Sequence, residues 1–279
     1  MDASQERVFH YHAASNALGG VLTHPYKTVV STAANTALAN AGGYNSSPTV
    51  PYHLDHVLHC KAAYTHATGG DEDGYWGTLT TAVVEDVNLL EVVTADKIVA
   101  QISSKHPKVG NVPIISFVGS QFVNLRINGK LVDPILDLHP LPGEPLPPKG
   151  NGSSKGKSQV SSFHHQDVRK LAAEQSRKMA KHPHAPDWVK HRYGWLESVN
   201  EINDRGHLLC SLVKEIRGSE PENTFGQVIH VPGFGNVFLA EVTLDANTYH
   251  LTMLRAEMGC ASSGTISMSA ATANGKTMP

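Results

Sequence analysis

The residues of this chain with the clearest chemical potential are its histidines, of which there are 17 among 279 residues. They are densest in YHLDHVLHCKAAYTH, residues 52–66, which holds four histidines and Cys60. Imidazole nitrogens bind zinc and other transition metals when several of them converge on one point. Whether this stretch forms a metal site therefore depends on whether the local backbone gathers the rings or spreads them.

The residues around 52–66 favour extended backbone, with Pro51 before the stretch and Tyr64-Thr65 within it. On a strand that rises ~3.3 Å per residue, His53 and His59 share a face but lie ~20 Å apart, so they cannot bind one ion together. In a helix, His56, His59 and Cys60 would be neighbours and a site would be possible. Because the strand is favoured, this stretch alone is expected to form no metal site.

A better placed pair is His10 and His12, because alternate residues of a strand face the same side and can supply two ligands to zinc or copper. A third ligand would come from elsewhere in the chain, with His24 and His56 as candidates. The metal hypothesis thus names His10, His12 and His56, and gives Asp55 the role of base in a zinc-dependent enzyme. Two histidines that are half-buried or face solvent are the simpler interpretation of the same pair.

The other motifs give little support to catalysis. GSSKG places Ser154 in a formal GxSxG pattern, but without the strand and helix that a nucleophile elbow needs. PGFGNVF is a lone GxG, typical of a turn between strands and not of a phosphate loop. GGDEDGYWG, with Asp71, Glu72 and Asp73, suits an acidic hairpin tip better than a calcium site, because the EF-hand spacing is absent.

Composition narrows the classes of partner. Lys and Arg number 23 against 25 Asp and Glu, a formal charge of −2, so neither nucleic acid nor anionic lipid is an expected partner. The three cysteines are far apart and form no CxxC pair, which argues against a disulfide scaffold and a zinc ribbon. Histidine charging near pH 6 would change the net charge strongly, so an acid-responsive assembly is one functional hypothesis.

The chain as given shows no targeting or membrane segment. Its opening residues, MDASQERVFHYHAAS, lack the basic start and the apolar stretch of a secretory signal. No segment has about 18 consecutive apolar residues, so we expect no transmembrane segment.

Residues 8–136 contain short runs rich in Val, Ile, Leu and Thr, broken by Gly, Asn, Asp and Pro, a pattern that predicts short strands. Asn128-Gly129 predicts a type I′ turn inside a hairpin over residues 121–134. Residues 87–103 read as two strands joined near Thr94-Ala95-Asp96, with a helix over 92–101 as the alternative. The first strands are expected to turn near Asn16, and residues 39–51 to form a polar loop.

The middle of the chain differs in composition. Residues 139–162 contain five prolines and four glycines, which predicts a linker or loop. Residues 166–181 then predict a helix, with Val168, Leu171, Ala172 and Met179 on one side. Strands are expected again at 195–202 and 207–216, around a loop at 203–206, followed by further strands with turns near Gly233 and Ala246.

These elements predict a mainly β protein, an antiparallel β-sandwich with a helical insertion. Residues 1–138 and 195–279 are expected to form one β domain from both halves of the chain, with residues 139–194 as the insertion. A β-solenoid is the alternative, since the segments near Asn88 and Asn124 share a loose V-N-L pattern without a fixed period.

Two segments, GSQFVNLRINGKLV (119–132) and HVPGFGNVFLAEVTLDANTYHLTMLRAEMG (230–259), loosely resemble the bacterial choice-of-anchor P family. The shared features are a short strand, an N-G turn and a late G-x-V-x-L-x-E segment. The resemblance implies an exported or surface-associated β protein, and it carries over no catalytic residue.

The sequence therefore favours a non-catalytic structural or binding protein at or outside the bacterial cell surface. Its expected partners are further copies of itself, through exposed strand edges, or a surface component. No cofactor is expected on this hypothesis. The alternatives are the zinc-dependent enzyme built on His10, His12 and His56, and the acid-responsive assembly.

Overall fold

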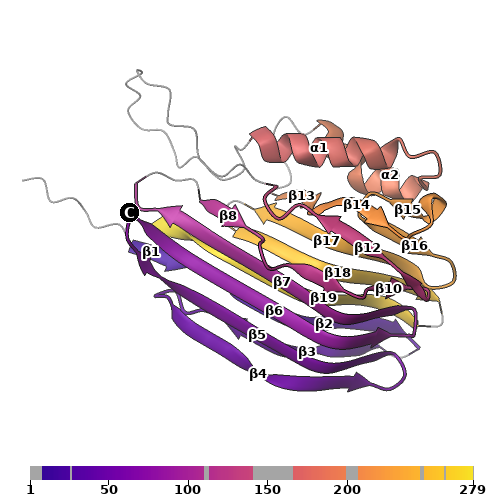
Figure 1. The fold of residues 1–279 in the computed structure, drawn as a ribbon, viewed down its shortest axis with the longest axis horizontal. Helices are drawn as coiled ribbons and strands as arrows, with labels where there is room; N and C mark the ends of the chain where they lie inside the picture. The colour runs from indigo at the N-terminus through magenta and orange to yellow at the C-terminus, as the bar shows by residue number, and fades with distance from the viewer. Residues whose placement is uncertain are drawn as a thin grey trace, which may run out of the picture.

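The fold is described by a computed structural model, which covers residues 8–25, 27–109, 113–140, 166–198, 207–245, 248–260 and 262–278. Two large sheets lie face to face, and a small helical layer covers part of one of them (Figure 1). The predicted antiparallel β-sandwich is confirmed. The β-solenoid alternative is wrong, because long neighbouring strands such as β5, β6 and β7 run antiparallel as a meander and do not stack in repeating parallel turns.

The nine-stranded sheet joins the two ends of the chain, because β2 pairs with β19. Its main order is β15-β16-β17-β18-β19-β2-β3, while β1 also pairs with β19 and β13 with β17. The strands are β1 Val8–Tyr11, β2 Ala14–His24, β3 Thr28–Ala37, β13 His207–Ser211, β15 Thr224–Phe225, β16 Val228–Val231, β17 Gly235–Asp245, β18 Thr248–Cys260 and β19 Ser262–Met278.

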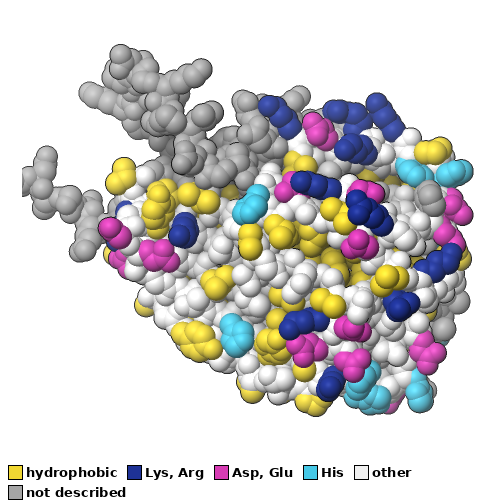
Figure 2. Space-filling view, viewed as in Figure 1, with side chains coloured by type: hydrophobic (Ala, Val, Ile, Leu, Met, Phe, Trp, Pro, Cys, Tyr) yellow, Lys and Arg dark blue, Asp and Glu magenta, His cyan; other side chains and the backbone are white. Residues whose placement is uncertain are grey.

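The eight-stranded sheet is built from one continuous part of the chain, in the order β11-β10-β7-β6-β5-β4, with β8 and β9 also paired to β7. Its strands are β4 Gly43–Leu54, β5 Leu58–Glu72, β6 Tyr75–Leu89, β7 Val93–Pro107, β8 Ile114–Ser116, β9 Gln121–Val123, β10 Arg126–Ile127 and β11 Lys130–Leu131. A separate ribbon pairs β12 Asp133–Leu136 with β14 Val213–Arg217. On the outer face of the eight-stranded sheet, Figure 2 shows acidic and basic side chains interspersed.

The helical layer consists of α1 Gln166–Ala180, α2 Asp187–Tyr193 and a 3-10 helix, Gly194–Ser198. The helix predicted over 166–181 is confirmed, and Ala172 and Met179 are buried as its pattern predicts. The strand predicted over 195–202 is wrong in its described part, because Trp195 Nε1 donates to the Arg192 carbonyl, 2.9 Å away, and the chain stays helical. The predicted linker lies largely, and the loop at 203–206 entirely, outside the described residues.

The histidine-rich stretch is a hairpin and not one strand. β4 ends at Leu54, Asp55 adopts a left-handed φ of 42°, and β5 begins at Leu58. The predicted ~20 Å separation of His53 and His59 by strand rise is therefore wrong. The two residues face each other across the hairpin, with ring centroids 5.8 Å apart. The polar loop predicted at 39–51 is wrong for most of its length, since β4 already begins at Gly43.

The turns predicted from the sequence are confirmed only in part. Asn128 and Gly129 have φ values of 52° and 76°, which confirms the predicted type I′ turn, although its ladder has only two residue pairs. The two strands predicted within 87–103 exist, but they turn at Leu90 and Glu91, whose φ values are 52° and 57°. The helix alternative and the turn near Asn16 are wrong.

A line of distorted residues, called the crease below, crosses the nine-stranded sheet. It includes Ala34, Ala240 and Ser269, with φ values of 55°, 48° and 50°. Strand register is the same on both sides: Thr252 pairs with Ala270, and Leu254 with Met268. The facing of the side chains nevertheless reverses, because the outward, more exposed positions of β18 are even-numbered before the crease and odd-numbered after it.

Small polar side chains connect the two sheets. The hydroxyls of Thr36 and Thr65 are 2.7 Å apart in the interior, and Thr80 donates to the Thr272 carbonyl at 3.1 Å. At the crease, the hydroxyl of Ser269 donates to the carbonyl of Ile98 in the opposite sheet, 2.9 Å away. Since these side chains are short, the sheets lie close together along these strands.

The described sheet edges are poor templates for adding a strand. β4 carries Pro48 and Pro51, and β3 has a register shift against β2 as well as the left-handed residue Ala34. At β13, the Gln175 side chain of α1 bonds both the backbone N–H and the carbonyl of Ser211, at 2.9 and 2.8 Å. Among the described helices, none is long and apolar enough to cross a membrane.

Candidate functional site

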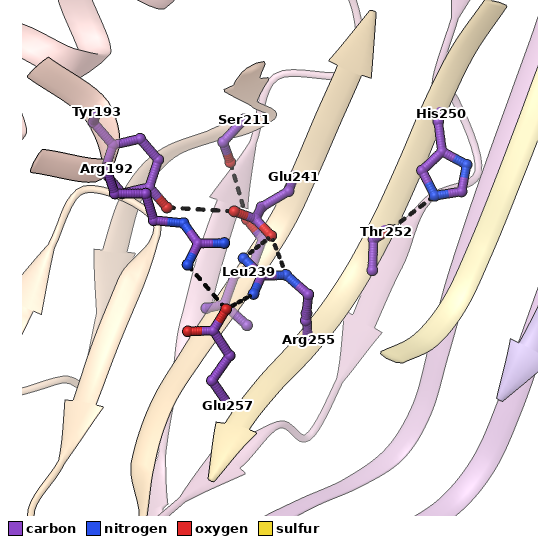
Figure 3. Close-up of polar contacts among 9 residues, drawn as sticks. All are labelled: Arg192, Tyr193, Ser211, Leu239, Glu241, His250, Thr252, Arg255 and Glu257. Atoms are coloured by element: carbon purple, nitrogen blue, oxygen red, sulfur yellow. Dashed lines mark hydrogen bonds and ion pairs between the residues drawn. The ribbon is translucent and has the colours of Figure 1, made fainter. Parts of the chain in front are cut away.

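The most highly organised polar group of the structure is the charged cluster of Glu241, Arg255, Glu257, Arg192 and Tyr193 (Figure 3). Register places the first three on the outer face of β17 and β18, and α2 supplies the last two. Arg255 bonds Glu241 through two nitrogens, at 2.6 and 2.8 Å, and also contacts Glu257. Arg192 bonds Glu257 at 2.9 Å, and the Tyr193 hydroxyl donates to Glu241 at 3.4 Å.

Phe238 lies beneath the guanidinium groups of this cluster. The Cζ atom of Arg255 is 3.8 Å from the centroid of the Phe238 ring, and that of Arg192 is 4.8 Å away. The Trp188 ring of α2 contacts the same phenyl group edge-on, with centroids 6.2 Å apart. Stacking of cations on an aromatic face adds attraction to the ion pairs. One apolar side chain thus supports both arginines.

The polar groups of the cluster are bonded to one another. Burial, reinforced by Glu241, raises the pKa of Tyr193, so its hydroxyl remains a hydrogen-bond donor. The Glu241 side chain is only 6% exposed and is neutralised by Arg255. Both of its oxygens are engaged, Oε1 by the Tyr193 hydroxyl and Oε2 by Arg255. The geometry therefore suits an anchor that fastens α2 to the sheet better than an acid or base for catalysis.

Beyond the helical layer, the outer face of the same sheet contains an open hollow of about 300 Å³, called the His250 hollow below. Neither a carboxylate nor an ammonium or guanidinium group lines it, and its apolar surfaces are alanines. Its lining residues are Ala14, Ser15, Asn16, Asn35, Thr36, Ala37, His250, Ala270 and Thr272. The volume is at the lower end for small-molecule sites.

His250 is held by two hydroxyl groups. Its Nδ1 lies 2.7 Å from the Thr272 hydroxyl and its Nε2 lies 3.2 Å from that of Thr252, which Figure 3 shows on the same strand. The protein around the ring disfavours its charged form and lowers the pKa of His250, and this exceeds the opposite effect of Asp245. The hollow is therefore uncharged at neutral pH.

The lowered pKa of His250 predicts a pH dependence of stability. The unfolded chain binds this proton near pH 6.5, before the folded chain does, so the contribution of His250 is intact above that pH and is lost as pH falls toward the lower folded pKa. Urea unfolding at pH 8, 6.5 and 5 should show a smaller acid loss in His250→Gln than in the unchanged protein. The exposed His191→Gln variant is the control, and an equal loss in all three proteins would contradict the prediction.

The histidines of the metal hypothesis are not brought together. His10 is exposed on β1 opposite Lys276, and His12 follows directly, donating its backbone N–H to the Asn274 carbonyl at 2.8 Å. His56 lies in the β4–β5 turn, whereas β1 packs at the other end of β5, about 40 Å away by strand rise. In the part of the chain that the structure describes, no three His, Cys, Asp or Glu side chains are placed to hold a metal.

Three other kinds of side chain that could act chemically, acidic, thiol and aromatic, are engaged in structural contacts or buried in the core. Asp71 and Glu72 end β5 at the predicted hairpin tip and form ion pairs with Lys108 and Lys105. Burial raises the pKa of Cys210 to about 12 and also raises that of Cys60, so both thiols stay protonated. Among the aromatic side chains, Trp76 and Tyr193 are buried, while Trp188 and Trp195 are half-buried against the core.

Neither the charged cluster nor the His250 hollow was found from the sequence. One signal was available: HLTMLRAEM places Arg255 and Glu257 within an otherwise apolar strand, where charges need partners. Arg192, more than 60 residues away in the helical insertion, had no comparable signal.

Fold and site together define an antiparallel β-sandwich protein whose helical layer is joined to the sheet by the Arg192–Glu257 ion pair and the Tyr193–Glu241 hydrogen bond. Residues 9–245 match the family described as Domain of unknown function (DUF8256), so the chain belongs to this family. Comparison with curated proteins and with solved structures gives no match. The resemblance to choice-of-anchor P proteins stays a prediction.

Proposed function

We propose that this chain is a non-catalytic binding protein whose His250 hollow takes an uncharged, hydroxyl-bearing ligand, such as a sugar unit of a surface component. The observation that carries the proposal is the lining of the hollow: two side-chain amides, the Thr272 hydroxyl and a neutral imidazole beside alanine surfaces, without a charged group. Such a lining suits a ligand with hydroxyl groups on an apolar ring skeleton.

Two asparagines provide the hydrogen-bonding capacity of the hollow. Asn16 accepts a bond from the Leu18 backbone N–H with its Oδ1, 3.1 Å away, which leaves its amide hydrogens for a ligand. Asn35 donates to the Thr32 hydroxyl at 3.2 Å, which leaves its carbonyl as an acceptor. A ligand with both donor and acceptor hydroxyls would match this pair.

The rest of the structure supports binding over catalysis. Glu241 and Glu257, the carboxylates most shielded on this face, are each bonded to arginine, and His250 is engaged by two threonines. The proline-bearing and distorted edges of β4 and β3 disfavour self-association by strand addition. We therefore assign partner binding to the sheet face. Placement at the bacterial cell surface remains part of the proposal.

The test is calorimetric titration of the whole protein with methyl glycosides of glucose, galactose, mannose and N-acetylglucosamine. We expect at least one to bind, and His250→Ala and Asn16→Ala each to weaken binding by about tenfold, as for a lost hydrogen bond. Thr265→Ala, on the same outer face of β19 but outside the hollow, is the matched control and should leave binding unchanged. Absence of binding, or binding equally affected by the control, would refute the proposal.

A further inference from the structure

We propose that His53 and His59 form a binding site for a divalent transition-metal ion at the end of the β4–β5 hairpin. The two residues are direct cross-strand partners on adjacent strands. Their ring centroids are 5.8 Å apart with an interplanar angle of 70°. Both side chains are exposed, so an ion can reach them from solvent.

This separation fits chelation by two imidazoles. Cross-strand partners hold their Cβ atoms about 5 Å apart, so their side chains start from positions that can meet. A metal about 2.1 Å from a ring nitrogen lies about 3 Å from the ring centre, and two such rings have centroids about 5 Å apart. Small rotations of the side chains therefore bring one nitrogen of each ring onto a common ion.

The hairpin backbone fixes the pair before any ion binds. Beside the histidines, Tyr52 pairs with Cys60 and Leu54 with Leu58, and both Leu58 and Cys60 are fully buried in the core. The turn is closed by a bond from the Val57 N–H to the Leu54 carbonyl, 2.9 Å long. Because the backbone is already ordered, binding requires only the two imidazoles to be fixed.

The surroundings select the class of ion. Imidazole ligands favour Cu²⁺, Ni²⁺ and Zn²⁺ over the oxygen-seeking Ca²⁺ and Mg²⁺. The Cys60 side chain, next to His59 along β5, faces the opposite side of the strand and is fully buried in the core, so it does not supply a ligand. Asn88 of β6 pairs with His59, but its side-chain oxygen already accepts a bond from the Glu91 N–H, 2.8 Å away, and is therefore engaged in the β6–β7 turn. Two protein ligands leave open positions for water, and His56 in the turn is the nearest further imidazole in the sequence.

The experiment is titration of the whole protein with CuCl₂ at pH 7.5, followed by calorimetry and by electron paramagnetic resonance of the bound ion. We expect the His53→Ala and His59→Ala variants each to bind the ion of this site at least tenfold more weakly. The spectrum of the unchanged protein should show nitrogen ligation that the double variant lacks. Since imidazole must be unprotonated to bind, affinity should fall on acidification.

Two matched double variants serve as controls. His10→Ala with His12→Ala removes the pair predicted from strand alternation, and His182→Ala with His184→Ala removes a second pair of neighbouring rings, 5.9 Å apart. Both should keep the Cu²⁺ site. Unfolding midpoints within 1 °C of the unchanged protein would show that the exposed substitutions preserve the fold. The assignment would be overturned if loss of both His53 and His59 left the affinity and nitrogen ligation of the Cu²⁺ site unchanged, or if the site disappeared in either control.

Discussion

Replacing Arg255 with methionine is expected to lower the free energy of unfolding by about 3–5 kcal/mol, the range found when one partner of a buried ion pair is removed. The Glu241 side chain is 6% exposed, and Arg255 supplies its ion-pair bonds at 2.6 and 2.8 Å. Methionine fills much of the space above Phe238 but leaves the carboxylate buried without a counter-charge. Urea unfolding at pH 7.5 gives the measurement.

Three further variants isolate the cause of that loss. Glu241→Gln in the Arg255→Met background removes the buried carboxylate charge that has lost its partner. It should recover part of the stability, since replacing both members of a buried pair costs less than breaking it. Arg217→Ala breaks an exposed pair with Glu215 and should change stability far less than Arg255→Met does, because solvent screens an exposed pair. Arg192→Met, at the more exposed end of the cluster, should fall between these extremes.

Either of two results would contradict the anchor role of the cluster. One is a loss in Arg255→Met no greater than that in Arg217→Ala. The other is a double variant that is less stable than Arg255→Met itself. In both cases the carboxylate of Glu241 would have found water or another partner, and the Arg255–Glu241 pair could not be what holds the cluster together on β17 and β18.

Features specified by neighbouring residues were predictable. The helix at 166–181 follows from apolar spacing that places Ala172 and Met179 on one side. The turn at Asn128-Gly129 follows from two residues that tolerate positive φ. Strand-rich texture on both sides of the insertion was sufficient to indicate a sandwich, because it requires only that many short apolar runs find partners.

Turns formed by residues that do not favour positive φ were missed. Leu90 and Glu91 make the β6–β7 turn, and Asp55 begins the turn that folds the histidine stretch into a hairpin. Propensities disfavour a left-handed conformation for Leu90 and Glu91; aspartate tolerates it more readily, but nothing in the sequence singled out Asp55. Tertiary pairing of long strands decided the turn positions. It also made His53 and His59 cross-strand partners, although the sequence predicted that they lie far apart on one strand.

The candidate sites could not be predicted from the pattern of apolar runs, because they depend on strand register and on contacts between distant segments. Glu241 and Arg255 meet through the register of β17 and β18, and Arg192 joins them from the helical insertion. The crease also prevents the outward positions of each strand from being predicted from the sequence, because the alternation of inward and outward side chains reverses at residues such as Ser269. His250 and Arg255, an odd number of residues apart, therefore share one face, which strict period-two reasoning excludes.

Substitution of Ser269 by valine should test the crease directly, with an expected loss of about 3–5 kcal/mol in the free energy of unfolding. Ser269 is fully buried with a φ of 50°, a conformation that strongly disfavours β-branched side chains. Valine also removes the hydroxyl that donates to the Ile98 carbonyl across the interior. Overpacking between the closely spaced sheets adds to both effects.

The same substitution two residues earlier in the strand is the matched control. Ser267 lies on the outer face of β19 and is half-buried, so Ser267→Val should change stability by about 0.5 kcal/mol or less. Ser269→Gly removes the strain, because glycine accepts the left-handed φ, so its loss, about 1–3 kcal/mol, reports the missing hydrogen bond together with the greater flexibility of the glycine backbone. Equal losses for valine at positions 267 and 269 would mean that the reversed alternation does not depend on a strained residue, and that β19 can cross the sandwich without the crease.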